Sequence, residues 1–171
     1  MSTNCDATHF ISCSGEIRIA RCVFRGMGDD AANVHGFYLT VRRIEGCRVI
    51  VSLDVAPQDF EMDLPDPGDQ LELVRSDTLL PYGTGTVLQV FWDGISRQAE
   101  LELSGDFMPQ AAVGDLLTNR SKAARLVFED NTAENIRGRA LLVQTRHAVV
   151  RDNRFVHCTG QGVHVDLSLI H

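Results

Sequence analysis

The sequence predicts an all-β fold, namely a right-handed parallel β-helix that carries an inserted small antiparallel β-barrel or sandwich module. Three observations predict it. Residues 126–146 and 148–168 repeat each other with a period of 22 residues. Residues 17–37 fit the same frame, although a long stretch separates them from the later repeats. Residues from about 42 to 117 do not follow the frame and alternate between short apolar strands and Pro or Gly turns.

The repeats predict stacked turns of chain, because self-similarity of this length is the signature of a repeat architecture in which each unit buries apolar residues against the next. Asn131 and Asn153 share one position, where we expect each coil to turn and the amide side chains to bond along the stack. Residues from about 1 to 16 supply a further, partial coil. The aligned apolar columns are Ile17, Leu126 and Ala148; Ile19, Phe128 and Val150; Phe24, Ala133 and Phe155; Met27, Ile136 and Cys158; and Val34, Val143 and Val165.

The domain boundaries follow from the frame. We expect residues 1–41 and 118–171 to form the parallel β-helix coils, and residues 42–117 to form the inserted β-barrel-like module. Within the insertion, the expected strands include residues 48–53, 70–74, 86–92 and 99–103.

Composition excludes several classes of function. Hydrophobic residues make up 44% of the 171 residues, which is enough for a core. A net charge of −7 and a pI near 5.3, without a basic stripe, argue against nucleic acid as a partner. No apolar run approaches 18 residues, so we expect no membrane partner. The five cysteines are odd in number and include no CxxC, so we expect small buried hydrophobes rather than a zinc site or a disulfide framework.

The candidate site begins with two adjacent acids, Asp29 and Asp30, which precede an alternating apolar and polar run. Asp6 opens a similar run 24 residues earlier, and the frame places it beside Asp30. Neighbouring strands in a sheet lie roughly 4.8 Å apart, so residues in one column are close neighbours. One outward face would then suit a hydroxyl-rich ligand, with the catalytic candidates Asp6, Asp29 and Asp30 and the substrate-binding candidates His9, Asn33, His35, Arg139 and Gln144.

The acids could act as the two carboxyl groups of an inverting glycosidase, which lie roughly 6.5–9.5 Å apart. Packed acids raise each other's proton affinity, which keeps one of them protonated as a general acid. Other interpretations stay open: the Asp pair could be a solvated corner or strand start, or the acids could hold calcium, as in β-helical pectate lyases. Arg139 could serve only to neutralise Asp30, and His35 could be a solvated strand residue.

Four segments carry a family resemblance: residues 6–15 (DATHFISCSG), 28–36 (GDDAANVHG), 114–119 (GDLLTN) and 137–145 (RGRALLVQT). They follow one another in order before the insertion, at its end and after it. On these segments the chain resembles the α-1,3-galactosidases of glycoside hydrolase family 110, which are parallel β-helices with inserted β-barrel modules.

The resemblance implies an exo-acting enzyme that hydrolyses a terminal α-linked galactose with inversion and without a metal or other cofactor. It implies that Asp6, Asp29 and Asp30 supply the acid and the base, and we expect Asp6 to be the acid and Asp29 and Asp30 to hold the attacking water. It also implies a secreted or periplasmic bacterial protein, although the first residues do not read as a signal peptide. The chain is short for this family and ends on an apolar tail, so we expect a fragment of a longer protein, open to self-association through its coil ends.

Two other classes of function remain as alternatives. A non-catalytic carbohydrate-binding β-helix would bind glycans without turnover. A calcium-dependent polysaccharide lyase would release an unsaturated product, but Arg139 is the only candidate for its base beside the acids.

Overall fold

The computed structural model describes residues 2–52, 64–105 and 111–166. All regular elements in these ranges are β-strands, which confirms the predicted all-β class. The same residues contain no helix that could cross a membrane. The chain divides into two compact units, one drawn from Met1–Gly36 and Ala123–Ser168 and the other from Phe37–Lys122.

The first unit consists of short strands from both ends of the chain. Its N-terminal segment supplies β1 (Thr8–Ile11), β2 (Glu16–Ala20), β3 (Val23–Arg25) and β4 (Ala32–His35). Its C-terminal segment supplies β11 (Arg125–Glu129), β12 (Thr132–Glu134), β13 (Leu141–Val143), β14 (Val149–Arg151), β15 (Arg154–Val156) and β16 (Val163–Val165).

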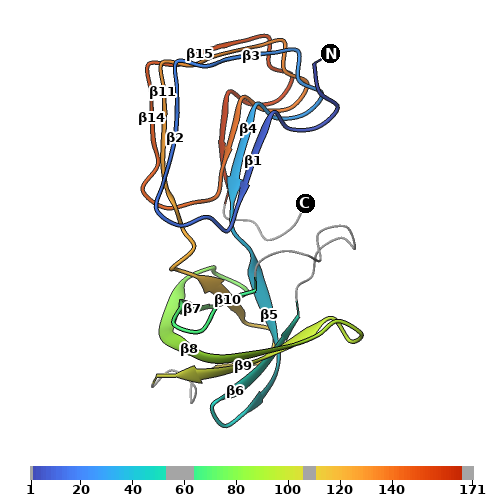
Figure 1. Cartoon of the computed structure of the whole chain (residues 1–171), viewed down its shortest axis with the longest axis vertical. Coiled ribbons are helices and arrows are strands. Elements are labelled where there is room, and N and C mark those ends of the chain that lie inside the picture. Colours follow the sequence, from blue (N-terminus) through green and yellow to red (C-terminus); the bar gives the residue numbers. More distant parts are fainter. Residues whose placement is uncertain (1, 53–63, 106–110, 167–171) are drawn as a thin grey trace. The chain divides into compact units, whose positions relative to one another are not determined.

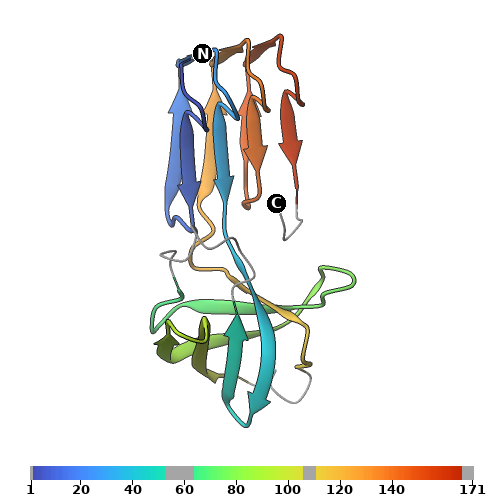
Figure 2. The same cartoon turned by 90° about the vertical axis from the view of Figure 1, so that its right-hand side faces the viewer.

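These strands form three parallel sheets, in the orders β1-β4-β13-β16, β14-β11-β2 and β15-β12-β3. Each pass of the chain visits the three sheets in the same sequence, so equivalent strands of successive passes lie side by side (Figures 1 and 2). Equivalent strands of the last two passes are 22 residues apart along the chain, whereas the barrel segment separates β4 from β11 in the sequence. The sequence repeat thus corresponds to a spatial stack.

The strand register reproduces the columns predicted from the 22-residue frame. Leu126 pairs with Ile17, and Phe128 lies between Ile19 and Val150. In the four-stranded sheet His9 pairs with Asn33, as the frame predicts. The remaining predicted columns that fall on strands are reproduced as well, including those of Phe24, Ala133 and Phe155 and of Val34, Val143 and Val165.

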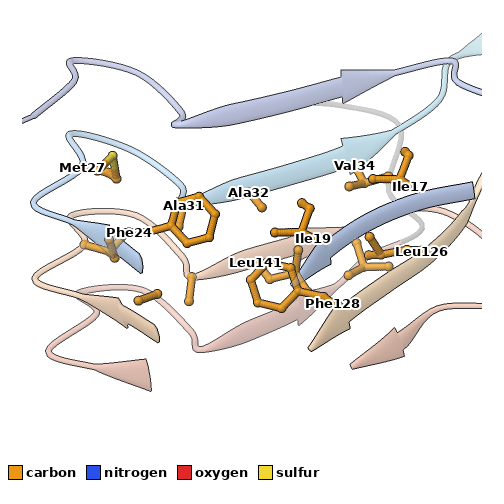
Figure 3. Close-up of a cluster of buried hydrophobic side chains, with 14 of the residues drawn as sticks. Ile17, Ile19, Phe24, Met27, Ala31, Ala32, Val34, Leu126, Phe128 and Leu141 are labelled. Atoms are coloured by element: carbon orange, nitrogen blue, oxygen red, sulfur yellow. The ribbon is translucent and has the colours of Figure 1, made fainter. Parts of the chain in front are cut away.

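The inward side chains of these columns form the core of the first unit (Figure 3). Phe128 is fully buried, and its ring lies 6.3 Å from that of Phe24 and 6.4 Å from that of Phe155, measured between centroids. Aromatic rings stacked at such distances stabilise the pair beyond the area that they bury. The core therefore gives a rigid support to the outward face of each sheet.

Asparagine side chains close the turn between the two three-stranded sheets. The Asn131 side-chain oxygen accepts a hydrogen bond from the Cys22 N–H of the preceding pass (2.9 Å), and its amide donates to Ile19 O (3.0 Å). Asn153 repeats the arrangement, because its oxygen accepts from the Asn131 N–H (2.9 Å). The expected bonding along the stack is thus present, between each amide and the backbone of the preceding pass.

The second unit is a closed antiparallel barrel, in the order β10-β5-β6-β9-β8-β7. The barrel was predicted, but its strands begin earlier and end later than the expected 42–117, because β5 and β10 pair with each other at Leu39 and Leu117. The predicted strand at 48–53 extends into residues outside the described ranges. The strands are β5 (Tyr38–Glu45), β6 (Arg48–Ser52), β7 (Gln70–Val74), β8 (Pro81–Asp93), β9 (Gln98–Ser104) and β10 (Leu116–Asn119).

Candidate functional site

Three acids meet at the start of the four-stranded sheet of the first unit. Asp6 precedes β1, and Asp29 and Asp30 precede β4, which pairs with β1 in parallel. The Ala7 N–H donates to Asp30 O (3.0 Å), so a backbone hydrogen bond holds the starts of the two strands side by side. One carboxylate oxygen from each acid lies within 4.8 Å of the others. We call Asp6, Asp29 and Asp30 the acid cluster.

Asp30 is completely buried and is held by Arg139 of the next pass. The Arg139 Nε lies 3.0 Å from each Asp30 carboxylate oxygen, and its Nη2 lies 2.9 Å from Oδ2. The Arg139 backbone N–H also donates to Asp30 Oδ1 (2.6 Å). A planar guanidinium matches a carboxylate in this way, and charge-assisted bonds of this kind are about twice as strong as neutral ones. Asp30 is therefore a buried anchor whose carboxyl group is paired with a guanidinium.

Asp6 is a carboxylate with two donors already in place. Its Oδ1 accepts from the Asp30 backbone N–H (3.1 Å), and its Oδ2 accepts from Asn33 Nδ2 (3.2 Å). The His9 Nδ1 lies 3.5 Å from the same Oδ2. The Asp6 side chain keeps 12% of its surface exposed, so it combines a fixed orientation with access to solvent.

Asp29 differs from its neighbours because it is exposed. The pKa of its carboxyl group is raised above the usual value of 3.8, first by partial desolvation and then by the charges of Asp30 and Asp6, while Arg139 acts in the opposite direction. A like charge nearby disfavours ionisation, so a proton stays on Asp29 to higher pH than on an isolated aspartate. The cluster thus combines an exposed acid whose pKa is raised with two carboxyl groups held by hydrogen bonds.

Gly138 packs directly against the acids, which the sequence interpretation missed. A Cβ atom on Gly138 would lie 2.5 Å from Asp30 Oδ1 and 2.7 Å from Asp29 Oδ1, which is too close for any side chain. The signal was present in the repeat, because Gly160 takes the equivalent position and would meet Gly138 O at 2.9 Å. Glycine therefore occupies this close contact in the last two passes, whereas Asp29 takes the equivalent position in the pass before them.

The other predicted residues lie on the outward face of the same sheet. His9 and His35 contact each other through their Nε2 atoms, which are 2.7 Å apart. Asn33 Oδ1 is buried and is the only buried side-chain nitrogen or oxygen without a hydrogen-bond partner among the described residues. Such an atom calls for a donor from elsewhere, for instance a ligand hydroxyl. Gln144 follows β13, where its backbone N–H donates to Val34 O (2.8 Å).

Among the residues that the structure describes, the carboxylate oxygens of the acid cluster lie close enough together to bind one cation. Carboxylate oxygens are the ligands that Ca²⁺ prefers, at 2.3–2.6 Å. Both oxygens of Asp30, however, are already bonded by Arg139. The same ion pair engages the guanidinium of Arg139, the residue that a lyase would need as its base.

The fold and the site together define an all-β protein whose parallel sheets present clustered acids. No protein-family model matches the chain. Curated homologues of the chain are named alpha-1,3-galactosidase, which confirms the resemblance predicted from the sequence. Alpha-1,3-galactosidase B of Bacteroides fragilis and that of Phocaeicola vulgatus are each 30% identical over 95% of the chain. Alpha-1,3-galactosidase A of Akkermansia muciniphila is 29% identical over 85%.

The matches are partial with respect to the relatives. The chain spans 29% of the Bacteroides fragilis protein, 28% of the Phocaeicola vulgatus protein and 24% of the Akkermansia muciniphila protein. The similarity therefore extends over nearly the whole chain, but over less than a third of each relative.

Proposed function

We propose that the chain is part of an exo-acting α-galactosidase, which hydrolyses a terminal α-1,3-linked galactose of a glycan with inversion and without a metal. The homologues named alpha-1,3-galactosidase support the substrate class. The observation that carries the proposal is the pairing of Asp29, whose pKa is raised, with the carboxylate of Asp6 at one edge of a rigid sheet.

In this proposal Asp29 is the general acid, which reverses the division of roles expected from the sequence. A general acid must carry a proton at the working pH and must reach the leaving oxygen of the substrate. Asp29 is exposed, and its raised pKa favours the protonated form. Asp6 is the base that orients the attacking water, because two hydrogen bonds fix the orientation of its carboxyl group beside the exposed Asp29.

Asp30 and Arg139 position the other two acids instead of reacting. The charge of Asp30 raises the pKa of Asp29, and its backbone N–H orients Asp6. Arg139 holds the buried Asp30 carboxyl group in place inside the stack. The galactose hydroxyls would meet His9 and His35 on the outward face, beside Asn33.

The spacing within the acid cluster favours one specific alternative, hydrolysis with retention. Nearest oxygens within 4.8 Å are closer to the roughly 5 Å typical of retaining pairs than to the roughly 6.5–9.5 Å typical of inverting pairs. Inversion at this site requires that substrate and water enter on different sides of Asp6 and Asp29. Proton NMR of the first galactose released distinguishes the two: the β-anomer supports inversion, whereas the α-anomer establishes retention.

We also propose that the first unit is a segment of a right-handed parallel β-helix. The support is the order in which each pass visits the three sheets and the register that keeps equivalent residues in columns. In such a scaffold the acid cluster and its partner Arg139 come from three consecutive passes, because Asp6, the Asp29–Asp30 pair and Arg139 each precede a different strand of the four-stranded sheet.

The test is the release of galactose from an α-1,3-linked galactosyl disaccharide. Asp6→Asn is expected to lower the rate by at least ~10²-fold, the typical contribution of a general base. Asp152→Asn is the matched control, because Asp152 is exposed at a turn with φ of 55°, a conformation that Asn adopts readily. Undiminished activity of Asp6→Asn would exclude the proposed role of Asp6.

A further inference from the structure

Two histidines beside the acid cluster are arranged in an unusual way. His9 lies on β1 and His35 on β4, on the same outward face. Their Nε2 atoms are 2.7 Å apart, and their ring centroids are 4.9 Å apart. The Nε2 atoms of the two rings therefore face each other.

The opposite nitrogen of each ring faces an acceptor. The His35 Nδ1 lies 3.1 Å from Gly36 O, and a carbonyl oxygen can only accept, so this nitrogen carries the hydrogen. The His9 Nδ1 lies 3.5 Å from the Asp6 carboxylate, which favours a hydrogen there too. In their neutral forms both rings then direct an Nε2 lone pair towards the other. Two lone pairs at this distance repel each other unless a cation lies between them.

The surroundings favour a cation. The acid cluster contributes three carboxyl groups and Arg139 one compensating positive charge, so the local balance is negative when the acids are ionised. The His9 side chain is 43% exposed, which leaves a path for an ion and room for water ligands. Imidazoles that bind metals characteristically donate their second ring N–H to a carboxylate or a backbone carbonyl, and here Asp6 and Gly36 supply both kinds of partner.

We infer that His9 and His35 form a binding site for a divalent transition-metal ion of the zinc type, with both Nε2 atoms as ligands and water in the remaining positions. Zinc–imidazole bonds of about 2.0–2.1 Å at a tetrahedral angle set the two nitrogens roughly 3.3 Å apart. The rings must therefore separate by about 0.6 Å on binding, which the exposed side chain of His9 permits. The repeat frame predicts that His9 and His35 share one face, but it does not predict that their Nε2 atoms meet.

The test is a titration of the purified chain with zinc chloride near pH 8, followed by calorimetry and by the NMR signals of the histidine rings. The His9 and His35 signals are expected to change together and to saturate at one equivalent. His9→Gln and His35→Gln should each weaken binding at this site at least tenfold. Asp6→Asn should weaken it by about 10–100-fold, as the loss of a carboxylate behind a ligating imidazole does.

His147→Gln is the matched control, because His147 is exposed at the turn before β14. The affinity of the His147→Gln variant for zinc at the His9–His35 site should equal that of the unmodified chain. Circular dichroism should confirm that all variants are folded. Zinc binding seen only at cysteines or at other histidines would overturn the inference. It would equally be overturned if the two rings took up a proton between them but showed no response to zinc.

One consequence rests on the proposed function. Because the histidine pair flanks Asp6, zinc bound there should inhibit galactose release in proportion to the occupancy of the site. Binding without inhibition would leave the metal site standing and would count against the placement of the substrate, so the two failures are distinguishable.

Discussion

At the scale of single residues, three aspartates of identical chemistry have three different environments. Asp30 is buried and paired with Arg139, Asp6 is held by two donors, and Asp29 is exposed with a raised pKa. The sequence predicts that these acids meet, because the 24-residue spacing matches the offset between neighbouring strands. It could not assign their roles, because burial depends on where Arg139 and Gly138 approach from a distant part of the chain.

The Asp30–Arg139 ion pair should be essential to stability. Arg139→Met leaves a fully buried carboxylate without its charge partner, which typically costs about 3–5 kcal/mol. Arg25→Met is the control, because the Arg25–Glu134 pair is exposed on the arginine side and such pairs contribute roughly 0–1 kcal/mol. Urea denaturation measures both. Equal losses in the two variants would contradict the anchoring role of Arg139.

The raised pKa of Asp29 should be visible as a dependence of stability on pH. The folded chain holds this proton to higher pH than the unfolded chain, so the free energy of unfolding falls as the pH rises from the unfolded pKa towards the folded one. Asp29→Asn removes this loss. The free energy of unfolding of Asp29→Asn minus that of the unmodified chain should therefore be larger near pH 7 than near pH 3. Denaturant titrations of both proteins at the two pH values measure this difference. A difference that does not change with pH would show that the Asp29 pKa is not raised.

At the scale of elements, the strands of the first unit are only three to five residues long and are joined by tight turns. These turns fix which side chains each sheet presents on its outward face. The 22-residue period predicts the register, because stacked side chains must match from pass to pass. It does not predict which turn glycines are sterically required. Gly138 and Gly36 are the same residue type in the sequence, yet only Gly138 touches the acids.

Gly138→Ala should therefore damage the site, since its Cβ would displace Asp29 and Asp30. Forcing an extra carbon into a packed position costs about 1–3 kcal/mol, and the shift of Asp29 should reduce galactose release as well. Gly36→Ala serves as the control, because a Cβ there meets no atom within 4 Å. If both variants kept full stability and activity, the close approach of Gly138 to the acids would be disproved.

The Asn131 amide should contribute to the stability of the stack. Asn131→Ala leaves the buried Ile19 carbonyl and the exposed Cys22 N–H without their partner, and a buried polar group left unpaired costs about 1–3 kcal/mol. Asn153→Ala should cost less, because Asn153 is more exposed and water can replace its bonds. Urea denaturation compares the two variants, and the reverse order of losses would count against this explanation.

At the scale of the whole molecule, the sequence predicts both units but misplaces their boundaries. The repeat identifies the stacked unit, and the alternating strands identify the barrel. The expected limits at 42 and 117 fall inside β5 and β10, because strands of the two units follow each other with almost no linker. A break in periodicity therefore marks an insertion only to within a few residues.

The roles of Asp29 and Asp6 can be separated with two substrates of different leaving-group quality, an α-1,3-linked galactosyl disaccharide and α-galactosyl fluoride. Fluoride departs without a proton, so loss of the general acid should affect only the disaccharide. Asp29→Asn is predicted to lose at least ~10²-fold on the disaccharide and to retain most of its activity on the fluoride, whereas Asp6→Asn should lose activity on both. The opposite pattern, with Asp6→Asn rescued by the fluoride and Asp29→Asn inactive on both, would contradict the assignment of Asp29 as the acid.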